Sequence, residues 1–194
     1  MLKATKVSDT EYNLWLKQDY GTQGYTSWFY FRVQNTRRLR TYRFNIVNLM
    51  RGDSSYTQGM RPLCYSDRKA LNEGIGWYRD GDNISYYLSN RKKVDKDGKE
   101  TTYYALSFDI TMTYDNDTVY FAQCYPYTYS DLRHYVLNNV TNSTKDRIRR
   151  TSLCKSNAGN EVDLLIVTNF ESEPIEMSVR PAVILTARVH PSET

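Results

Sequence analysis

Two residues near the end of the chain, His190 and Glu193, are of types that bind metal ions. An imidazole nitrogen and a carboxylate oxygen are two of the three ligand types that a catalytic zinc ion commonly uses. Pro191 lies between them and restricts the backbone of the turn that sets their relative direction. By spacing alone, two ordinary polar residues near a chain end explain the same pattern, so the metal site is one of two interpretations.

The residues just before this pair predict the element that positions it. Residues 182–189 form an apolar run rich in aliphatic side chains, with a proline on each side. Such a run is typical of a strand buried on both faces. Sites in α/β proteins form just past the carboxyl ends of such strands. We therefore expect His190 and Glu193 at the mouth of a sheet.

Composition favours a folded, β-rich protein. Of the 194 residues, 40% are hydrophobic and 25% are charged, which is enough apolar material for a core. The 18 tyrosines suit half-buried sheets, because each has an aromatic body and a polar tip. The net charge of +4 is too modest to indicate nucleic acid binding, and we expect no nucleic acid partner.

Cysteine usage and hydropathy indicate a cytosolic location. Cys64, Cys124 and Cys154 are odd in number and widely spaced, which is typical of reduced thiols rather than a disulfide framework. Residues 1–20 lack the apolar run of a signal peptide, and no segment is apolar enough to span a membrane. We expect no membrane association.

The first two thirds of the chain predict a mainly β fold. Strands are expected at residues 12–16, 28–33 and 41–49, with the last two forming a hairpin. Residues 104–112 alternate apolar and polar side chains, which predicts one face on a core and the other in water. With a further strand at 118–124, the pattern predicts an antiparallel β-sandwich.

The residues between and after these strands predict loops and helices as well as strands. Residues 51–76 read as a long surface loop, with a helical turn at 66–73 capped by Ser66. Past Pro126 a helix capped by Ser130 is expected, followed by a hairpin and the final apolar strand. We therefore predict two domains: a β-sandwich at residues 1–125 and the incomplete start of an α/β domain at residues 126–194.

Other candidate residues have simpler interpretations. His134 falls on the predicted helix, where a surface or structural role is more common than metal binding. No nucleophile stands in a recognisable catalytic motif. Basic clusters at residues 37–40, 91–93 and 147–150 read as solvated turns, with recruitment of an acidic partner as the alternative.

Several short strings resemble a known family. Tyr-Pro-Tyr-Thr-Tyr-Ser at residues 125–130 and Ala-Arg-Val-His-Pro-Ser-Glu at residues 187–193 are the most specific. They resemble the cytosolic carboxypeptidases, the tubulin-deglutamylating branch of the zinc metallocarboxypeptidases that also contains carboxypeptidase A. The family usually has Gly at the position of Ser192, a small departure at a residue that is not a ligand. Further matching strings lie at residues 11–14, 28–31, 42–46, 59–62, 84–87 and 158–160.

The resemblance implies that His190 and Glu193 are the first two ligands of one zinc ion. It implies a β-sandwich ahead of an α/β zinc-carboxypeptidase domain, and tubulin or other glutamate-rich tails as partners. It also implies a cytosolic protein, with association to microtubules, cilia or basal bodies. The family's second histidine, general-base Glu and carboxylate-binding Arg have no counterpart here, so we expect no catalytic residue in this chain and an inactive polypeptide. The alternative function is a non-catalytic β-sandwich that binds partners or docks tubulin; the substrate-binding residues and oligomeric state stay open.

Overall fold

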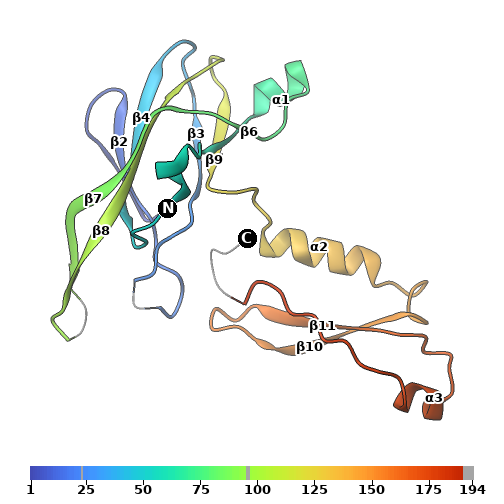
Figure 1. Cartoon of the computed structure of the whole chain (residues 1–194). Coiled ribbons are helices and arrows are strands. Elements are labelled where there is room, and N and C mark those ends of the chain that lie inside the picture. Colours follow the sequence, from blue (N-terminus) through green and yellow to red (C-terminus); the bar gives the residue numbers. More distant parts are fainter. Residues whose placement is uncertain (23, 95–96, 190–194) are drawn as a thin grey trace. The chain divides into compact units, whose positions relative to one another are not determined.

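The computed structural model describes residues 1–22, 24–94 and 97–189, and the chain divides into two compact units (Figure 1). The first unit comprises Met1–Pro126, and the second begins at Tyr127. The two units are described separately below. The expected mainly β fold is confirmed, since strands make up most of the regular structure.

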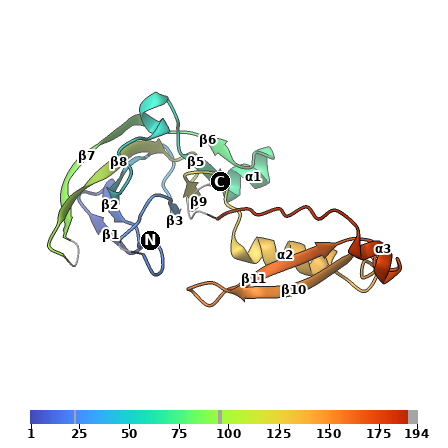
Figure 2. The same ribbon diagram turned by 60° about the horizontal axis from the view of Figure 1, so that its bottom comes forward.

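The first unit is a sandwich of two sheets, which face each other in Figure 2. A five-stranded sheet has the order β1-β2-β4-β8-β7, and a four-stranded sheet has the order β3-β9-β5-β6. The strands of the larger sheet are β1 (Lys3–Lys6), β2 (Glu11–Trp15), β4 (Thr41–Leu49), β8 (Glu100–Thr111) and β7 (Asp82–Val94). Those of the smaller sheet are β3 (Tyr30–Gln34), β9 (Thr118–Ala122), β5 (Leu63–Ser66) and β6 (Tyr78–Arg79).

Strand pairing differs from the expected hairpin. β3 and β4 do not pair: β3 pairs with β9 in the smaller sheet, and β4 lies between β2 and β8 in the larger one. The chain leaves the larger sheet after β2, crosses to the other sheet as β3, and returns as β4. This crossing makes β2 and β4 parallel, with Leu14 opposite Ile46, so the sandwich is antiparallel except at this pair.

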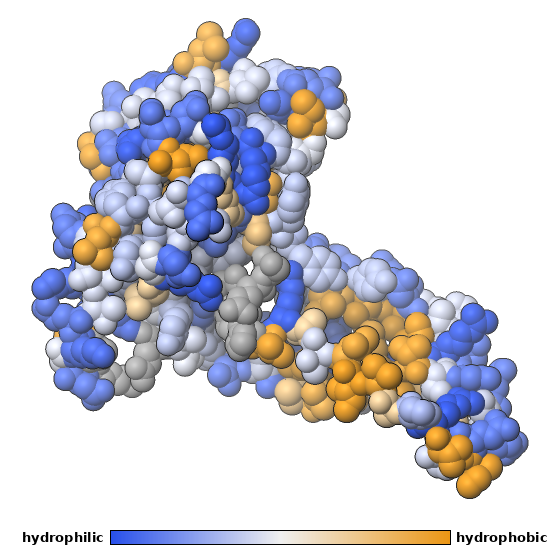
Figure 3. Space-filling model, viewed as in Figure 1, coloured by the Kyte–Doolittle hydropathy of each residue, from blue (hydrophilic) through white to orange (hydrophobic). Residues whose placement is uncertain are grey.

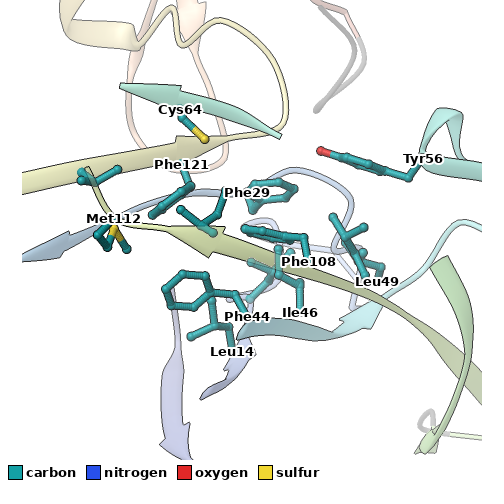
Figure 4. Close-up of a cluster of buried hydrophobic side chains, with 14 residues drawn as sticks. Leu14, Phe29, Phe44, Ile46, Leu49, Tyr56, Cys64, Phe108, Met112 and Phe121 are labelled. Carbon is teal, nitrogen blue, oxygen red and sulfur yellow. The ribbon is translucent and has the colours of Figure 1, made fainter. Parts of the chain in front are cut away.

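The core between the sheets is aromatic (Figure 4). The Phe44 ring of β4 lies 5.7 Å from Phe108 of β8 and 5.4 Å from Phe121 of β9, measured between ring centres. Phe31 of β3 lies 5.2 Å from Phe121. Phe108 and Phe121 have no exposed surface, and burying such a side chain stabilises the fold by about 2–3 kcal/mol. These contacts join both sheets into one unit.

The alternation of apolar and polar residues expected in β8 is present, but its polar face is not fully exposed to solvent. Ser107 has no exposed surface, and its hydroxyl donates to Asn45 Oδ1 at 2.6 Å. The Asn45 amide donates in turn to Glu11 Oε1 at 2.8 Å and to Asn13 Oδ1 at 3.1 Å. Buried polar groups need partners of this kind, so a row of hydrogen bonds replaces water on this part of the larger sheet.

The stretch expected to be a long surface loop holds buried structure. A helical turn capped by Ser66 is confirmed: α1 spans Asp67–Glu73, and the Ser66 hydroxyl accepts from Lys69 N. Before it, the short 3-10 helix η1 (Ser55–Gln58) buries Tyr56, and β5 follows as an interior strand. The surface-loop expectation was wrong here because so short a strand leaves too few residues for a periodic pattern.

The second unit consists of a helix, a hairpin and a short helix: α2 (Tyr129–Asn139), β10 (Ile148–Lys155), β11 (Glu161–Val167) and α3 (Pro174–Ser178). The expected cap at Ser130 was wrong. Thr128 caps α2, accepting from Asp131 N at 3.2 Å, while the Asp131 carboxylate accepts from Thr128 N at 2.7 Å. Threonine and aspartate three residues apart form this reciprocal box, which the sequence already contained.

Candidate metal centre

The two predicted ligands, His190 and Glu193, lie outside the residues that the structure describes. The segment that leads to them is described up to residue 189, and the strand predicted at residues 182–189 is absent from it. Val183, Ile184 and Leu185 are 83%, 86% and 90% exposed. The prediction of a doubly buried strand was wrong because such a strand needs a neighbour on each side, and no described strand pairs with this segment.

This segment instead runs beside β11, with a groove of about 430 Å³ between them. Hydrophobic side chains gather on this unit in Figure 3, and those of β11 are 37–71% exposed. Apolar side chains of both β11 and the segment thus line the groove, and the segment forms no described strand pairing with β11. The lining residues include Leu164, Ile166, Met177, Pro181, Val183 and Leu185.

Arg180 and Arg188 hold the two ends of the segment. Arg180 donates to the Thr168 hydroxyl at 2.8 Å, just beyond the end of β11. Arg188 donates to the main-chain oxygen of Tyr127 at 2.8 Å, and its guanidinium lies 5.0 Å from the centre of the Tyr127 ring. Arg188 has a φ of 56°, a conformation that is uncommon outside glycine. The residue two positions before His190 is therefore tied to the residue just before the cap of α2.

A buried carboxylate joins the elements of this unit. Asp163 of β11 has a side chain that is 5% exposed. It accepts from Arg150 Nε of β10 at 2.6 Å and from Arg133 Nη1 of α2 at 3.0 Å. Two cations around one buried anion offset the cost of removing that anion from water. The bridge fixes the helix against the hairpin.

Helix α2 carries the other histidine of the chain, His134. His134 lies exposed on α2, as expected for a surface role. Hydrogen bonds from the Thr128 hydroxyl and N–H lower the pKa of nearby Asp131, which supports its capping role. Among the described residues no group of three or more His, Cys, Asp or Glu side chains is placed to hold a metal ion.

The anchors of this unit were missed in the sequence. The Thr128 cap had a local signal, a threonine followed three residues later by a carboxylate. The contact between Arg188 and Tyr127 had no such local signal, because the partners are 61 positions apart.

The three cysteines are free, with Cys64 buried, Cys124 half-buried and Cys154 exposed. No helix in the described ranges combines the length and apolar character needed to cross a membrane.

A solved protein shares this fold. The crystal structure of a metallo-carboxypeptidase from Burkholderia cenocepacia superposes with a TM-score of 0.56 at 16% identity. The match covers 88% of this chain and 38% of that one. At this identity the likeness concerns the fold alone.

Sequence comparison finds closer relatives. The chain is 46% identical over 193 residues to cytosolic carboxypeptidase 2 of Homo sapiens, covering 99% of this chain and 21% of the human one. It is 41% identical over 195 residues to cytosolic carboxypeptidase 3 of Mus musculus, covering 99% and 18% of the two chains. The chain thus spans about a fifth of the length of the relatives it matches.

The first unit also matches a family as a whole. The family described as the cytosolic carboxypeptidase N-terminal domain matches residues 2–124, which include every strand of the sandwich. Since this match extends over most of the sequence, the chain belongs to the cytosolic carboxypeptidase N-terminal domain family.

Proposed function

We propose that this chain is the N-terminal portion of a cytosolic zinc metallocarboxypeptidase that removes glutamates from polyglutamylated or C-terminal glutamate tails of tubulin. The observation that carries the proposal is the 46% identity with a human cytosolic carboxypeptidase over 193 residues. That alignment covers 99% of this chain, so it extends through both units. The identity therefore reaches beyond the sandwich into the unit that leads to the candidate ligands.

The donor types of His190 and Glu193 fit a zinc ion, which takes imidazole nitrogen and carboxylate oxygen. Two donors do not complete a catalytic site, which has three protein ligands. The family resemblance implies that the third ligand is a second histidine from outside these 194 residues. When bound, zinc in such a site polarises a scissile carbonyl and lowers the pKa of a water molecule.

The proposal gives two described residues of the second unit, Arg188 and Asp163, the role of positioning this pair. Arg188, which is two positions before His190, ties the segment to Tyr127. Asp163 holds α2 to the hairpin. The proposed role of these residues is mechanical: they limit where a ligand that follows Val189 is held. A catalytic geometry must be kept within fractions of an ångström, so anchors of this kind serve the site without touching substrate.

Glutamate release from a polyglutamylated peptide tests the proposal. The 194-residue chain is compared with a polypeptide that follows the same reading frame into any further coding sequence, each with zinc supplied. We expect glutamate release from the longer protein alone, and loss of release in its His190→Ala variant. Zinc-dependent turnover by the 194-residue chain, or unchanged turnover in the variant, would contradict the proposal.

A second candidate function is a binding module, favoured by one observation. The first unit buries its own aromatic core between two sheets, so it has the structural basis of an independent domain. A pulldown with tubulin, before and after removal of its acidic tails, tests this candidate. Capture that depends on the tails supports docking, and a longer reading frame without glutamate release would favour docking over catalysis.

A further inference from the structure

Strand β3 has a free edge. In the described part of the chain its one strand neighbour is β9. Gln123 N donates to Phe29 O at 3.1 Å, which places Phe29 among the residues that bond across to β9. In an antiparallel pair such residues alternate with residues whose N–H and C=O point the other way. The backbone groups of Arg32 and Gln34 therefore point away from β9, toward open space at the sheet edge.

An apolar groove runs along this same edge. Its volume is about 550 Å³, within the range of about 300–1,000 Å³ that is typical of ligand sites. Its deepest residues, Leu14 and Phe44, belong to the core and are 5% and 3% exposed. Phe31 and Val33 of β3 remain half-buried. The apolar part of the lining includes Tyr12, Leu14, Phe31, Val33, Tyr42 and Phe44, and Arg32 and Gln34 of β3 line the groove as well.

The edge is positively charged. The side chain of Arg32 is exposed, and no ion pair joins it to another described residue. Arg37, also exposed, follows just past the end of β3. No aspartate or glutamate lines the groove. Along β3, the half-buried Phe31 and Val33 thus border the apolar part of the groove, while the exposed Arg32 at its rim has no ion-pair partner among the described residues.

We propose that β3 binds an extended segment of another protein in which acidic and apolar residues alternate. Backbone pairing at a free sheet edge adds a strand to the sheet. Side chains of the added strand alternate between the two faces, so one set enters the groove and the other lies beside Arg32. The apolar set is selected by the groove and the acidic set by the cation. This surface lies in the first unit and does not depend on the proposed peptidase function.

Peptide binding to the full 194-residue chain tests the proposal. The probe is a short fluorescein-labelled peptide that alternates Glu with Val, followed by fluorescence anisotropy. A second peptide has the same composition with the Glu and Val residues in separate blocks. A third carries N-methyl groups on alternate amides, which removes the donors that would face β3. We expect binding of the first peptide, and clearly weaker binding of the other two.

Two substitutions locate the site. Gln34→Pro removes an N–H that points away from β9, and proline is tolerated where the N–H of an edge strand faces solvent. It should weaken binding about tenfold, because a strand-to-strand hydrogen bond is lost and the ring obstructs pairing. Arg32→Glu should weaken it about fivefold through charge reversal. Gln34→Ala and the remote Lys145→Glu are the controls, expected to change the affinity by less than about twofold.

Circular dichroism melting first confirms that each variant is folded. Binding of the first peptide by Gln34→Pro with wild-type affinity would overturn the proposal, as would equal affinity for the alternating and block peptides. A dimer in light scattering that dissociates with Gln34→Pro, and that the peptide does not displace, would assign the edge to a second copy instead. Tighter binding of oligothymidine than of the alternating peptide would assign it to nucleic acid.

Discussion

The guanidinium of Arg188 both donates to the main-chain oxygen of Tyr127, at 2.8 Å, and lies over the ring of the same residue, 5.0 Å from its centre. One side chain therefore holds both the backbone and the ring of its partner. The contact closes a loop from the start of the second unit to residue 188. Arg188 lies two positions before the first candidate ligand, His190.

Replacing Arg188 with alanine should release this end of the segment. The free energy that holds this end of the segment in place should fall by about 1 kcal/mol, because an exposed cation–π contact and a hydrogen bond each contribute about that much or less. Hydrogen exchange of residues 181–189 should accelerate in the variant, as followed by mass spectrometry. Arg147→Ala is the control, since the exposed Arg147 side chain forms an ion pair only with its neighbour Asp146 among the described contacts. Equal exchange in both variants would show that Arg188 anchors nothing.

Asp163→Asn should destabilise the second unit more than any exposed charge change. The substitution leaves the guanidinium groups of Arg133 and Arg150 without their shared buried anion. The expected cost is about 3 kcal/mol, typical of removing one partner from a buried pair. Urea unfolding followed by circular dichroism measures it. Asp146→Asn, which removes the ion pair between a half-buried carboxylate and the exposed Arg147, should cost less than about 1 kcal/mol.

Tyr56→Phe should stabilise the first unit. Tyr56 is 7% exposed, and its buried hydroxyl has no hydrogen-bond partner among the described residues. A buried hydroxyl without a partner costs about 1–3 kcal/mol, so its removal should raise the free energy of unfolding by about 1 kcal/mol. Phe121→Ala is the contrasting variant, with an expected loss of about 4 kcal/mol. A loss of stability in Tyr56→Phe would indicate that the hydroxyl is bonded in solution.

The stability of the first unit should fall in alkaline solution. Burial raises the pKa of Tyr86 from its ordinary value of 10.0 to about 12. Between these values the unfolded chain loses a proton that the folded chain keeps, so folding becomes less favourable as pH rises. The contribution of Tyr86 to folding stability is fully present below pH 10.0, the pKa of the unfolded side chain. Unfolding measured across this window should show a shallower decline in Tyr86→Phe, and an unchanged slope would contradict the assignment.

The isolated chain should bind zinc weakly. His190 and Glu193 are two donors of a site that needs three from the protein. Zinc measured by plasma mass spectrometry after dialysis should therefore be well below one ion per chain. His190→Ala should lower the remainder further, with His134→Ala as the control. Retention of one zinc ion per chain through dialysis would mean that the site is completed in another way.

Local periodicity predicted the strands of the sandwich well. β4 and β8 carry patterns long enough to be recognised without their neighbours, and the Ser66 cap of α1 depends on side chains close in sequence. Pairing was harder to predict, because it joins distant segments. β3 and β4 appeared to form a hairpin through their short connection, yet Phe31 lies opposite Phe121 in the other sheet.

In the second unit, composition alone did not predict the secondary structure correctly. Residues 182–189 have the composition of a buried strand, but a strand depends on neighbours that composition does not describe. The ligand roles of His190 and Glu193 rest on residue types and on the family resemblance, and they stay predictions. Arg188 was absent from the list of candidate residues because its partner Tyr127 is distant in sequence.

The pairing of β3 with β9 has a consequence for biosynthesis. Residues 30–34 emerge from the ribosome well before their partner strand at residues 118–122, which is made only after most of the first unit. Until then Phe31 has no Phe121 to pack against, and the nascent chain carries an uncovered apolar strand. Contacts between such distant segments make folding slow. The nascent sandwich is therefore expected to depend on chaperones until its ninth strand is synthesised.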